Sequence, residues 1–340
     1  MTTAPDPGLV TRFRADVGSA LGRAIERHER IALAVSGGPD SMAMLSLAAA
    51  AFRGQVIAAT VNHRLRPEAA DEAAMVAAYC ARIDVSHATL PVVEPRDPRD
   101  NLHDWARGQR YALLKRWAVD ASAHFLATAH HADDQAETFL MRAARGSGVA
   151  GLAGVRVRQQ LGGATPIELI RPLLGWRVAE LRAIAVASAI PFVDDPSNAD
   201  DRFDRTAFRA LLRDTDVLDP RQIARSAAHA AEADAALRAM EPWLWDSRKV
   251  TPTGVDDPDF QSWLDMAGLP RELKRRLARS AIALVRTING ITSPDFSDAS
   301  NIESLLDALD SGKSATHAGV LGVSKGTIWR FSAAPPRRSL

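Results

Sequence analysis

The stretch Ile31-Ala32-Leu33-Ala34-Val35, followed by Ser36-Gly37-Gly38-Pro39-Asp40-Ser41, decides the fold of this chain. Five apolar residues in a row are typical of a short strand buried on both faces. The alanine-rich run 42–52 predicts a helix. Between strand and helix, Gly37 and Gly38 can adopt positive φ and leave backbone N–H groups to point at an anion. Pro39 suits the first helical position, and the positive end of the helix dipole completes a phosphate-binding turn.

Two other phosphate-binding patterns do not fit this turn. A Walker loop needs Lys and Ser or Thr after its last Gly, where this chain has Pro39 and Asp40, and the dinucleotide fingerprint needs a third spaced Gly. The remaining pattern, Ser-Gly-Gly-x-Asp-Ser, resembles the loop of the N-type ATP pyrophosphatases. That resemblance implies that the loop holds the pyrophosphate of ATP. A plain turn without a ligand is the simpler alternative, but it would not need three polar side chains.

Composition narrows the class of protein. A length of 340 residues predicts two domains, or at most three. The single cysteine, Cys80, excludes a disulfide framework and any all-cysteine metal site within one chain. No apolar run approaches the ~20 residues of a membrane span, and the segment 1–8 lacks the features of a signal peptide, so we expect a cytoplasmic protein without membrane contact. A net charge of +1 means that nucleic acid would be bound by local basic patches.

Strand-like and helix-like runs alternate along the first part of the chain. The expected strands are 31–35, 55–61, 85–93 and 124–129, and the expected helices are 9–29, 42–52, 67–83 and 102–120. This alternation predicts an α/β fold with a doubly wound parallel sheet. Ligands bind such sheets at the carboxyl ends of the strands, where this chain has polar residues at Ser36, Asn62-His63 and His130-His131.

A second dense polar stretch runs from His130 to Glu137. Asp133 and Asp134 lie at the predicted start of a helix, and Glu137 shares a helical face with Asp133. Carboxylates and a histidine beside a triphosphate suit a Mg²⁺ site or a proton acceptor. Asp133 as a simple helix cap, and the histidines as structural residues, are the alternatives.

Two groups of arginines recur at helical spacing. The first is Arg202, Arg205, Arg209 and Arg213, and the second is Arg271, Arg275 and Arg279. Each group would line one face of a helix, so a role in binding phosphates is predicted for both. A solvated helix face paired with local carboxylates is the alternative.

Several motifs together resemble the tRNA(Ile)-lysidine synthetase family. They are 36–41, 61–66, Ala106-Arg107 with Arg110-Tyr111, 130–137, Arg145-Gly146-Ser147-Gly148, 171–174 and 195–198. The likeness is dense over residues 30–212 and weaker around 312–316 and 328–331, and the length is that of the compact form. The family often has Asp-His-Gly-Leu-Arg where this chain has Asn62-His63-Arg64-Leu65-Arg66, and Arg-Asn where it has Arg205-Thr206.

The resemblance implies ligation of L-lysine to the wobble cytidine of a tRNA(Ile) with a CAU anticodon. ATP first adenylates the cytosine and releases pyrophosphate, and the lysine amine then displaces AMP. ATP and Mg²⁺ are the implied cofactors. The implied ATP-binding residues are Ser36, Gly37, Gly38, Pro39, Asp40, Ser41, Asn62, His63, Arg107, Arg145 and Gly146. The implied catalytic residues are His130, Asp133, Asp134, Glu137 and Arg205, and the metal would be held by Asp40, Asp133 and Asp134. The tRNA would contact Arg202, Arg209, Arg213, Arg271, Arg275 and Arg279.

The expected organisation is an adenylating domain of the N-type ATP pyrophosphatase class over 1–215 and a helical connector over 216–240. A smaller, mainly helical domain that binds tRNA would follow over 241–332, with a disordered tail at 333–340. Oligomeric state is left open. Two other functions compete: a tRNA-thiolating enzyme on the same core, which would need more cysteines than Cys80, and a nucleotide-sensing RNA-binding module without catalysis.

Overall fold

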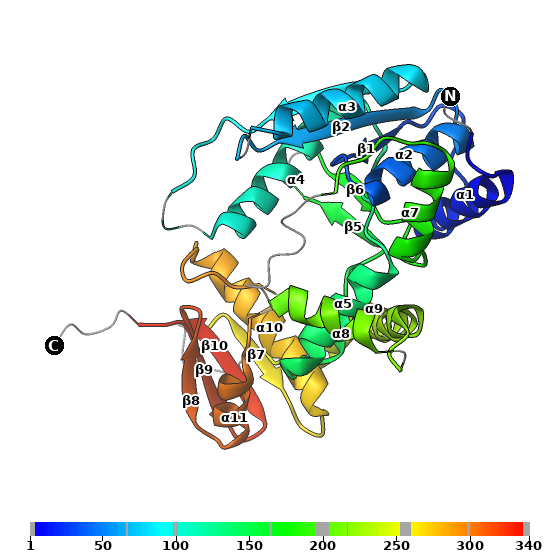
Figure 1. The fold of residues 1–340 in the computed structure, drawn as a ribbon. Coiled ribbons are helices and arrows are strands. Elements are labelled where there is room, and N and C mark those ends of the chain that lie inside the picture. Colours follow the sequence, from blue (N-terminus) through cyan, green and yellow to red (C-terminus); the bar gives the residue numbers. More distant parts are fainter. Residues whose placement is uncertain are drawn as a thin grey trace. The chain divides into compact units, whose positions relative to one another are not determined.

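The computed structural model describes residues 4–65, 67–97, 99, 101–162, 165–194, 204–215, 217–251, 260–297 and 300–335. The chain divides into two compact units, one ending at Glu232 and the other beginning at Ala233 (Figure 1). The division falls inside helix α9 (Pro220–Arg248). The assignment of adenylation to one part and tRNA binding to the other stays a prediction.

The first unit is built on a six-stranded sheet in the order β3-β2-β1-β4-β6-β5. Its strands are β1 (Ile31–Ala34), β2 (Val56–Asn62), β3 (Ser86–Pro91), β4 (Phe125–Ala127), β5 (Arg158–Leu161) and β6 (Ile167–Ile170). All neighbours pair in parallel except β5, which forms an antiparallel hairpin with β6. The structure confirms the predicted doubly wound sheet.

Helices cover both faces of this sheet (Figure 1). One face carries α1 (Pro7–Leu21), α2 (Pro39–Ala51), α3 (Ala69–Arg82) and α7 (Val178–Ala187), and the other carries α4 (Leu102–Asp120). Helix α2 is apolar over most of its surface, and its residues from Ser41 to Ala48 are all buried. Such a helix is stable only inside a core, so it packs between α1 and α7.

The first part of α9 belongs to the first unit, and so do three further helices. They are α5 (Ala132–Ala144), α6 (Val149–Leu152) and α8 (Asp204–Asp214). The predicted N-terminal helix 9–29 is too long, because α1 ends at Leu21, where Gly22 adopts a left-handed conformation with φ of 72°. That conformation satisfies the last carbonyl groups of a helix and stops its growth.

The second unit combines helices with an antiparallel sheet. Strands β7 (Ser262–Asp265), β10 (Ile328–Ala333), β9 (Val320–Lys325) and β8 (Ser314–His317) lie in that order, beside α10 (Arg271–Ile288) and α11 (Glu303–Asp310). Trp329 and Phe331 point from β10 into the core formed with the helices. Helical residues outnumber strand residues here, as predicted, but the sequence analysis did not predict the sheet. Its strands are only four to six residues long, and polar and apolar residues do not alternate regularly along them.

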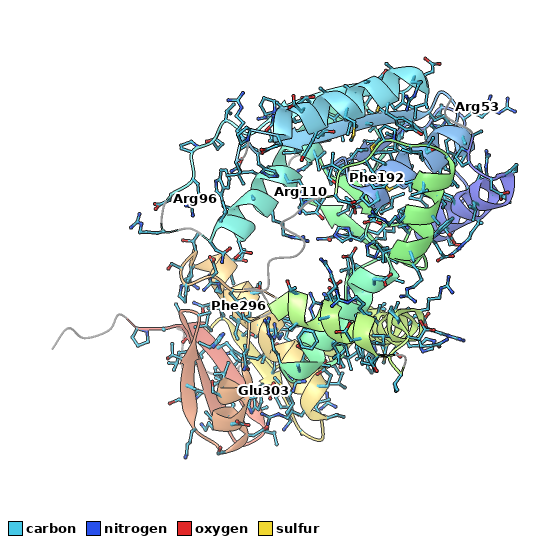
Figure 2. The ribbon with its side chains drawn as sticks, viewed as in Figure 1. Arg53, Arg96, Arg110, Phe192, Phe296 and Glu303 are labelled. Atoms are coloured by element: carbon cyan, nitrogen blue, oxygen red, sulfur yellow. The ribbon has the colours of Figure 1, made fainter. Side chains whose placement is uncertain are left out.

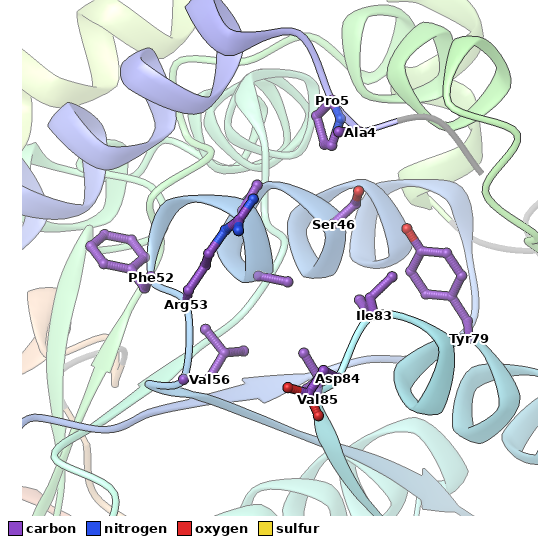
Figure 3. A pocket seen from close by; sticks show the side chains of 13 residues that line it. Ala4, Pro5, Ser46, Phe52, Arg53, Val56, Tyr79, Ile83, Asp84 and Val85 are labelled. Carbon is purple, nitrogen blue, oxygen red and sulfur yellow. The ribbon is translucent and has the colours of Figure 1, made fainter. Parts of the chain in front are cut away.

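A cavity of about 360 Å³ opens in the first unit between the ends of α2 and α3 (Figure 3). It lies beside Val56 and Val85, where β2 begins and β3 is about to begin. Ligands of parallel sheets bind at the opposite, carboxyl edge, so this cavity is not the candidate active site. Among the described residues, no helix is long and apolar enough to cross a membrane.

An ion pair anchors the turn that leads into β1. Both carboxylate oxygens of Glu29 accept hydrogen bonds from the Arg23 guanidinium, at 2.5 and 2.8 Å, and the N–H of Glu26 donates a third at 2.9 Å. The bond with Arg23 lowers the pKa of Glu29 to about 2, against the opposing effect of burial. Because this folded-state pKa lies below the ordinary 4.5, the stabilisation is complete above about pH 4.5 and lost as the pH falls toward 2.

We therefore expect Glu29→Gln to lower the free energy of unfolding by about 2 kcal/mol at pH 7, allowing for screening at the half-exposed Arg23. The difference from the unmodified protein should shrink at pH 3, because Glu29 is protonated there in the unfolded chain while it stays largely ionised in the folded protein, so part of the stabilisation is lost. Urea titrations at both pH values measure this. Glu26→Gln, at an exposed neighbour, is the control, and an equal loss at both pH values would contradict the ion-pair explanation.

The single cysteine is sealed in the core. Cys80 on α3 is fully buried, and burial raises the pKa of its thiol to about 12. We expect the native protein to resist thiol-labelling reagents and the urea-unfolded protein to react at once, since the thiolate is the reactive form. Rapid labelling of the folded protein, followed by mass spectrometry, would contradict this expectation.

Candidate active site

The strand order reverses between β1 and β4. From β1 the chain moves outward to β2 and β3, then crosses back to β4 on the other side of β1. Such a reversal leaves a crevice at the carboxyl ends of the two strands, where ligands of doubly wound sheets bind. The Ser36–Ser41 loop follows β1 and the histidine pair His130-His131 follows β4. The structure therefore brings together the two polar stretches that the sequence analysis selected.

The loop after β1 has the conformation of an anion-binding turn. Gly37 has φ of 91°, and a Cβ atom there would lie 3.5 Å from Met75, so backbone conformation and not crowding requires glycine. Gly38 has an ordinary φ of −73° and precedes Pro39 at the start of α2. No side chain caps α2, so its first N–H groups face the loop without a side-chain acceptor. This arrangement suits a phosphate.

The two serines hold the loop closed on itself. The Ser41 hydroxyl donates to the carbonyl of Gly38 at 3.0 Å and accepts from the N–H of Ser36 at 3.2 Å. The two hydroxyls are also 3.2 Å apart. These bonds fix the curvature of the loop before any ligand binds.

Asp40, His131 and Asp134 form an acidic cluster beside the loop. The Nε2 atom of His131 lies 3.6 Å from Asp40 Oδ2 and 3.5 Å from Asp134 Oδ2. The Oδ1 atom of Asp40 is buried and has no hydrogen-bond partner among the described residues. A cation or a proton donor could satisfy this oxygen.

The charge of His131 follows from these neighbours. Burial alone would lower its pKa, but the hydrogen bond to Asp40 and the charges of Asp134, Asp40 and Asp133 together raise that pKa to about 9. The N–H of Asp134 lies 3.3 Å from Nδ1, a contact that suits a neutral ring. Three carboxylates outweigh one long hydrogen bond, so His131 is a cation at neutral pH.

The adjacent His130 has the opposite preference. Burial lowers its pKa to about 4; Asp134 opposes this shift, and the charges of Arg171, Arg107 and Arg110 add to it. Its Nδ1 shares a 2.9 Å hydrogen bond with the Thr128 hydroxyl. A neutral imidazole can accept a proton, which is the role predicted for one group in this stretch.

Asp133 and Glu137 are tied to neighbouring helices. Both oxygens of Asp133 accept from the Arg177 side chain at 3.0 and 3.2 Å, and one also accepts the Val178 N–H at 2.8 Å. Glu137 is 3% exposed and pairs with Arg209 of α8 at 2.9 Å. Asp133 therefore fixes the start of α7, and Glu137 binds α8 to α5. Asp133 as the simple cap of its own helix is wrong, because His131 is the N-cap of α5; Asp133 instead accepts an N–H at the start of α7.

The turn after β2 explains one departure from the family pattern. Arg64 has φ of 55°, in the left-handed region where glycine is favoured, and the Asn62 side chain accepts its N–H at 2.8 Å. The family's glycine at this position needs no such support. His63 is half-buried, and desolvation together with the charge of Arg110 lowers its pKa.

A group of cations lies near His130, whose pKa their charges help to lower. The guanidinium carbons of Arg107 and Arg110 lie 5.0 and 5.8 Å from the centre of the Tyr111 ring, all three residues being on α4 (Arg110 is labelled in Figure 2). Tyr111 is also a hydrogen-bond partner of Arg171, which follows β6. Sequence analysis assigned a role to Arg107 but not to Arg110, Tyr111 or Arg171. Their occurrence inside the family-like motifs was the available signal.

The structure does not bring every predicted ATP-binding or catalytic residue to this edge. Arg145 and Gly146 follow the end of α5, a helix of 13 residues that begins after His131, so they lie about 20 Å further along its axis. Arg202 lies outside the described residues, as does the side chain of Arg205. The roles of these four residues stay predictions.

The remaining predicted tRNA contacts are engaged in ion pairs and hydrogen bonds. Arg271 pairs with Glu303, Asp307 and Asp310 of α11 (Glu303 is labelled in Figure 2). Arg275 pairs with Glu272 and Glu303, and Arg279 donates to the carbonyl groups of residues 297 and 300. Arg209 pairs with Glu137, and Arg213 with Asp214. Phosphates would have to compete with these partners.

The donor set fits a magnesium ion in part. Within the described ranges, no group of three or more His, Cys, Asp or Glu side chains is placed to hold a metal. Mg²⁺ needs only one or two carboxylates when phosphates and waters complete its shell. Asp40, with its unpartnered Oδ1, and Asp134 meet this need. Asp133 fits less well, because Arg177 and the Val178 N–H already occupy its oxygens.

Comparison with known proteins places this geometry in a family. A model described as the PP-loop domain matches residues 10–215. A tRNA(Ile)-lysidine synthase of Novosphingobium aromaticivorans is 40% identical over 332 residues, which cover 98% of this chain and 96% of the relative. The enzyme of the same name from Zymomonas mobilis is 38% identical over 91% of this chain and 90% of its own length.

A solved structure supports the fold alone. The U34-tRNA thiolase NcsA from Methanococcus maripaludis matches with a TM-score of 0.56 at 19% identity, covering 67% of this chain and 78% of its own. The sequence relatives are far more similar and extend over nearly the whole length. With its phosphate-binding loop at the reversal of a doubly wound sheet, the chain belongs to the tRNA(Ile)-lysidine synthase family of PP-loop proteins.

Proposed function

We propose that this chain ligates L-lysine to the wobble cytidine of a tRNA(Ile) with a CAU anticodon, using ATP. The observation that carries the proposal is the uncapped start of α2, which lies with Asp40 and the histidine pair at the β1–β4 crevice. Relatives about 40% identical over almost the entire chain bear the name of this activity.

In the first step, the ring carbonyl oxygen of the cytosine attacks the α-phosphorus of ATP and pyrophosphate leaves. Backbone N–H groups at the start of α2 and in the Ser36–Ser41 loop would bind the departing pyrophosphate. They are fixed before the reaction, so they stabilise negative charge without reorganisation. Arg107 would stabilise charge at the reacting phosphate from the other side of the crevice.

In the second step, the lysine ε-amine attacks the adenylated carbon and AMP leaves. The attacking ammonium must first lose a proton. His130, whose pKa burial lowers to about 4, is neutral at pH 7 and would accept a hydrogen bond from the amine, while the proton itself passes to solvent. His131 is charged and would instead hold Asp40 in place.

A magnesium ion would be held by Asp40 and Asp134 and would neutralise charge on the phosphates when bound. The acidic cluster contributes the negative charge that such an ion requires. Arg177 and Asp133 would position α7 beside this site without contacting the metal.

The thiolation alternative is not favoured. Cys80 is the only cysteine, and it is fully buried on α3, away from the carboxyl edge. A non-catalytic sensor would need the phosphate-binding loop but not the pair of histidines with opposite charge preferences.

Asp40→Asn tests the loop assignment. We expect tRNA-dependent release of pyrophosphate to fall at least about 100-fold, because the metal and the leaving group lose a carboxylate in the crevice. The affinity for tRNA should stay within about twofold, since surface RNA contacts lie elsewhere. A coupled pyrophosphate assay and filter binding measure the two quantities.

The matched control is Asp71→Asn, at an exposed position in the first turn of α3. It removes the same charge from the first turn of another helix. Pyrophosphate release that persists in Asp40→Asn, or falls equally in Asp71→Asn, would contradict the role of Asp40.

The arginines of α10 remain a proposed tRNA contact. If Arg271, Arg275 and Arg279 exchange their present partners for phosphates, replacing all three with Ala should flatten the salt dependence of tRNA binding. The log–log slope should change by roughly two units, at ~0.7 to 0.9 per lost contact. Fluorescence titrations at several salt concentrations, with Arg182→Ala as the control, provide the slope. An unchanged slope would restrict these arginines to the ion pairs between α10 and α11.

A further inference from the structure

Arg171 is a fully buried arginine that the proposed reaction does not use. Arg171 directly follows β6 and is only 2% exposed. One terminal nitrogen donates to the carbonyl of Arg156 at 2.5 Å and the other to the Gln159 amide oxygen at 3.3 Å. Its Nε is buried without a hydrogen-bond partner. Within the described part of the chain it forms no ion pair, although burying an unpaired charge costs several kcal/mol.

The neighbours of Arg171 add positive charge instead of balancing it. Desolvation lowers the pKa of Arg171, its hydrogen-bond partner Tyr111 opposes this, and the charge of Arg107 adds to it. Arg107 and Arg110 both lie over the Tyr111 ring. Like Arg171, neither forms an ion pair within the residues that the structure describes. On α10, by contrast, Arg271, Arg275 and Arg276 pair with carboxylates.

The location of this group is the active edge. The residue before Arg171 pairs with the end of β4, where the N–H of Thr128 donates to the carbonyl of Ile170 at 3.2 Å. Thr128 in turn contacts His130, whose pKa the charges of Arg171, Arg107 and Arg110 help to lower. Three cations without a carboxylate, gathered at a ligand-binding edge, form a site for an anion.

We propose that Tyr111, Arg107 and Arg110 form a phosphate-binding wall and that Arg171 is its positioning residue. Arg171 holds Tyr111 in place, so that the ring orients Arg107 and Arg110 toward a phosphate group. Arg171 does not touch the ligand, because it is sealed from solvent. This inference rests on the proposed function and extends it by naming a group behind the site. The phosphate belongs either to ATP or to the tRNA backbone, and ATP is favoured because the loop after β1 lies at the same edge.

The test compares Arg171→Met with Arg171→Lys. We expect Arg171→Met to weaken ATP binding about tenfold, since two charge-assisted contacts lose their orientation. Its urea-unfolding midpoint should stay equal or rise, because replacing an unpaired buried charge by an apolar group of similar volume is neutral or stabilising. Arg171→Lys keeps the charge and should recover part of the affinity.

Arg158→Met is the matched control, because Arg158 lies on the same hairpin but pairs with Glu168. It should leave ATP binding unchanged. Tyr111→Phe removes the hydroxyl that Arg171 holds and keeps the ring, so it should weaken ATP binding in the same direction. This variant decides the proposal even if Arg171→Met fails to fold.

Isothermal titration with ATP and filter binding with an unmodified tRNA(Ile) transcript distinguish the two sources of phosphate. Loss of ATP affinity assigns the wall to ATP, and loss of tRNA affinity alone assigns it to the tRNA backbone; both support the wall. Unchanged affinity for both ligands together with a lower unfolding midpoint would overturn the proposal and make Arg171 a structural residue. If the unmodified protein binds ATP but releases no pyrophosphate with tRNA and lysine, the proposed function fails, while the binding comparison still decides the role of Arg171.

Discussion

The parallel pairing of β1 with β4 is the constraint on which the rest of the structure depends. Ile31, Ala32 and Leu33 align with Phe125, Leu126 and Ala127, so the two strands end at the same edge. The loop after β1 and the histidines after β4 therefore lie close together, although they are far apart in the sequence. Helix α2 is apolar over most of its surface and lies buried in the core on one face of this sheet.

The crevice divides into an acidic and a basic side. Asp40 and Asp134 surround the charged ring of His131, whereas Arg107, Arg110 and Arg171 surround Tyr111 and the neutral ring of His130. Two histidines that are adjacent in the sequence thus have pKa values of about 9 and about 4. A polyanionic nucleotide with its metal would complement both sides, since the metal suits the carboxylates and the phosphates suit the guanidinium groups.

The roles of charged residues at helical spacing could be assigned only from their partners in the structure. Asp133 and Glu137 lie four residues apart, as a shared site would require, yet one binds Arg177 and the other Arg209. Arg271 and Arg275 of α10 pair with carboxylates of α11, which follows them by about thirty residues. A periodic pattern of charge indicates a helix face, but the opposing element decides whether that face binds a partner chain or the protein itself.

The sequence by itself determined the parallel sheet, the tight turn after its first strand and the edge at which the two polar stretches meet. Those features depend on local causes: a continuous apolar strand, glycine at a positive φ in Gly37, and proline at the start of a helix. Tertiary structure alone decided the antiparallel sheet of the second unit, whose short strands gain their burial from α10 and α11. It also decided which cations have no carboxylate partner among the residues that the structure describes. Arg171 and Arg271 are the same type of residue. Arg171, which follows β6, is buried near other cations, whereas Arg271 pairs with carboxylates of α11. Long-range packing makes this difference, because it sets the local dielectric and the neighbouring charge.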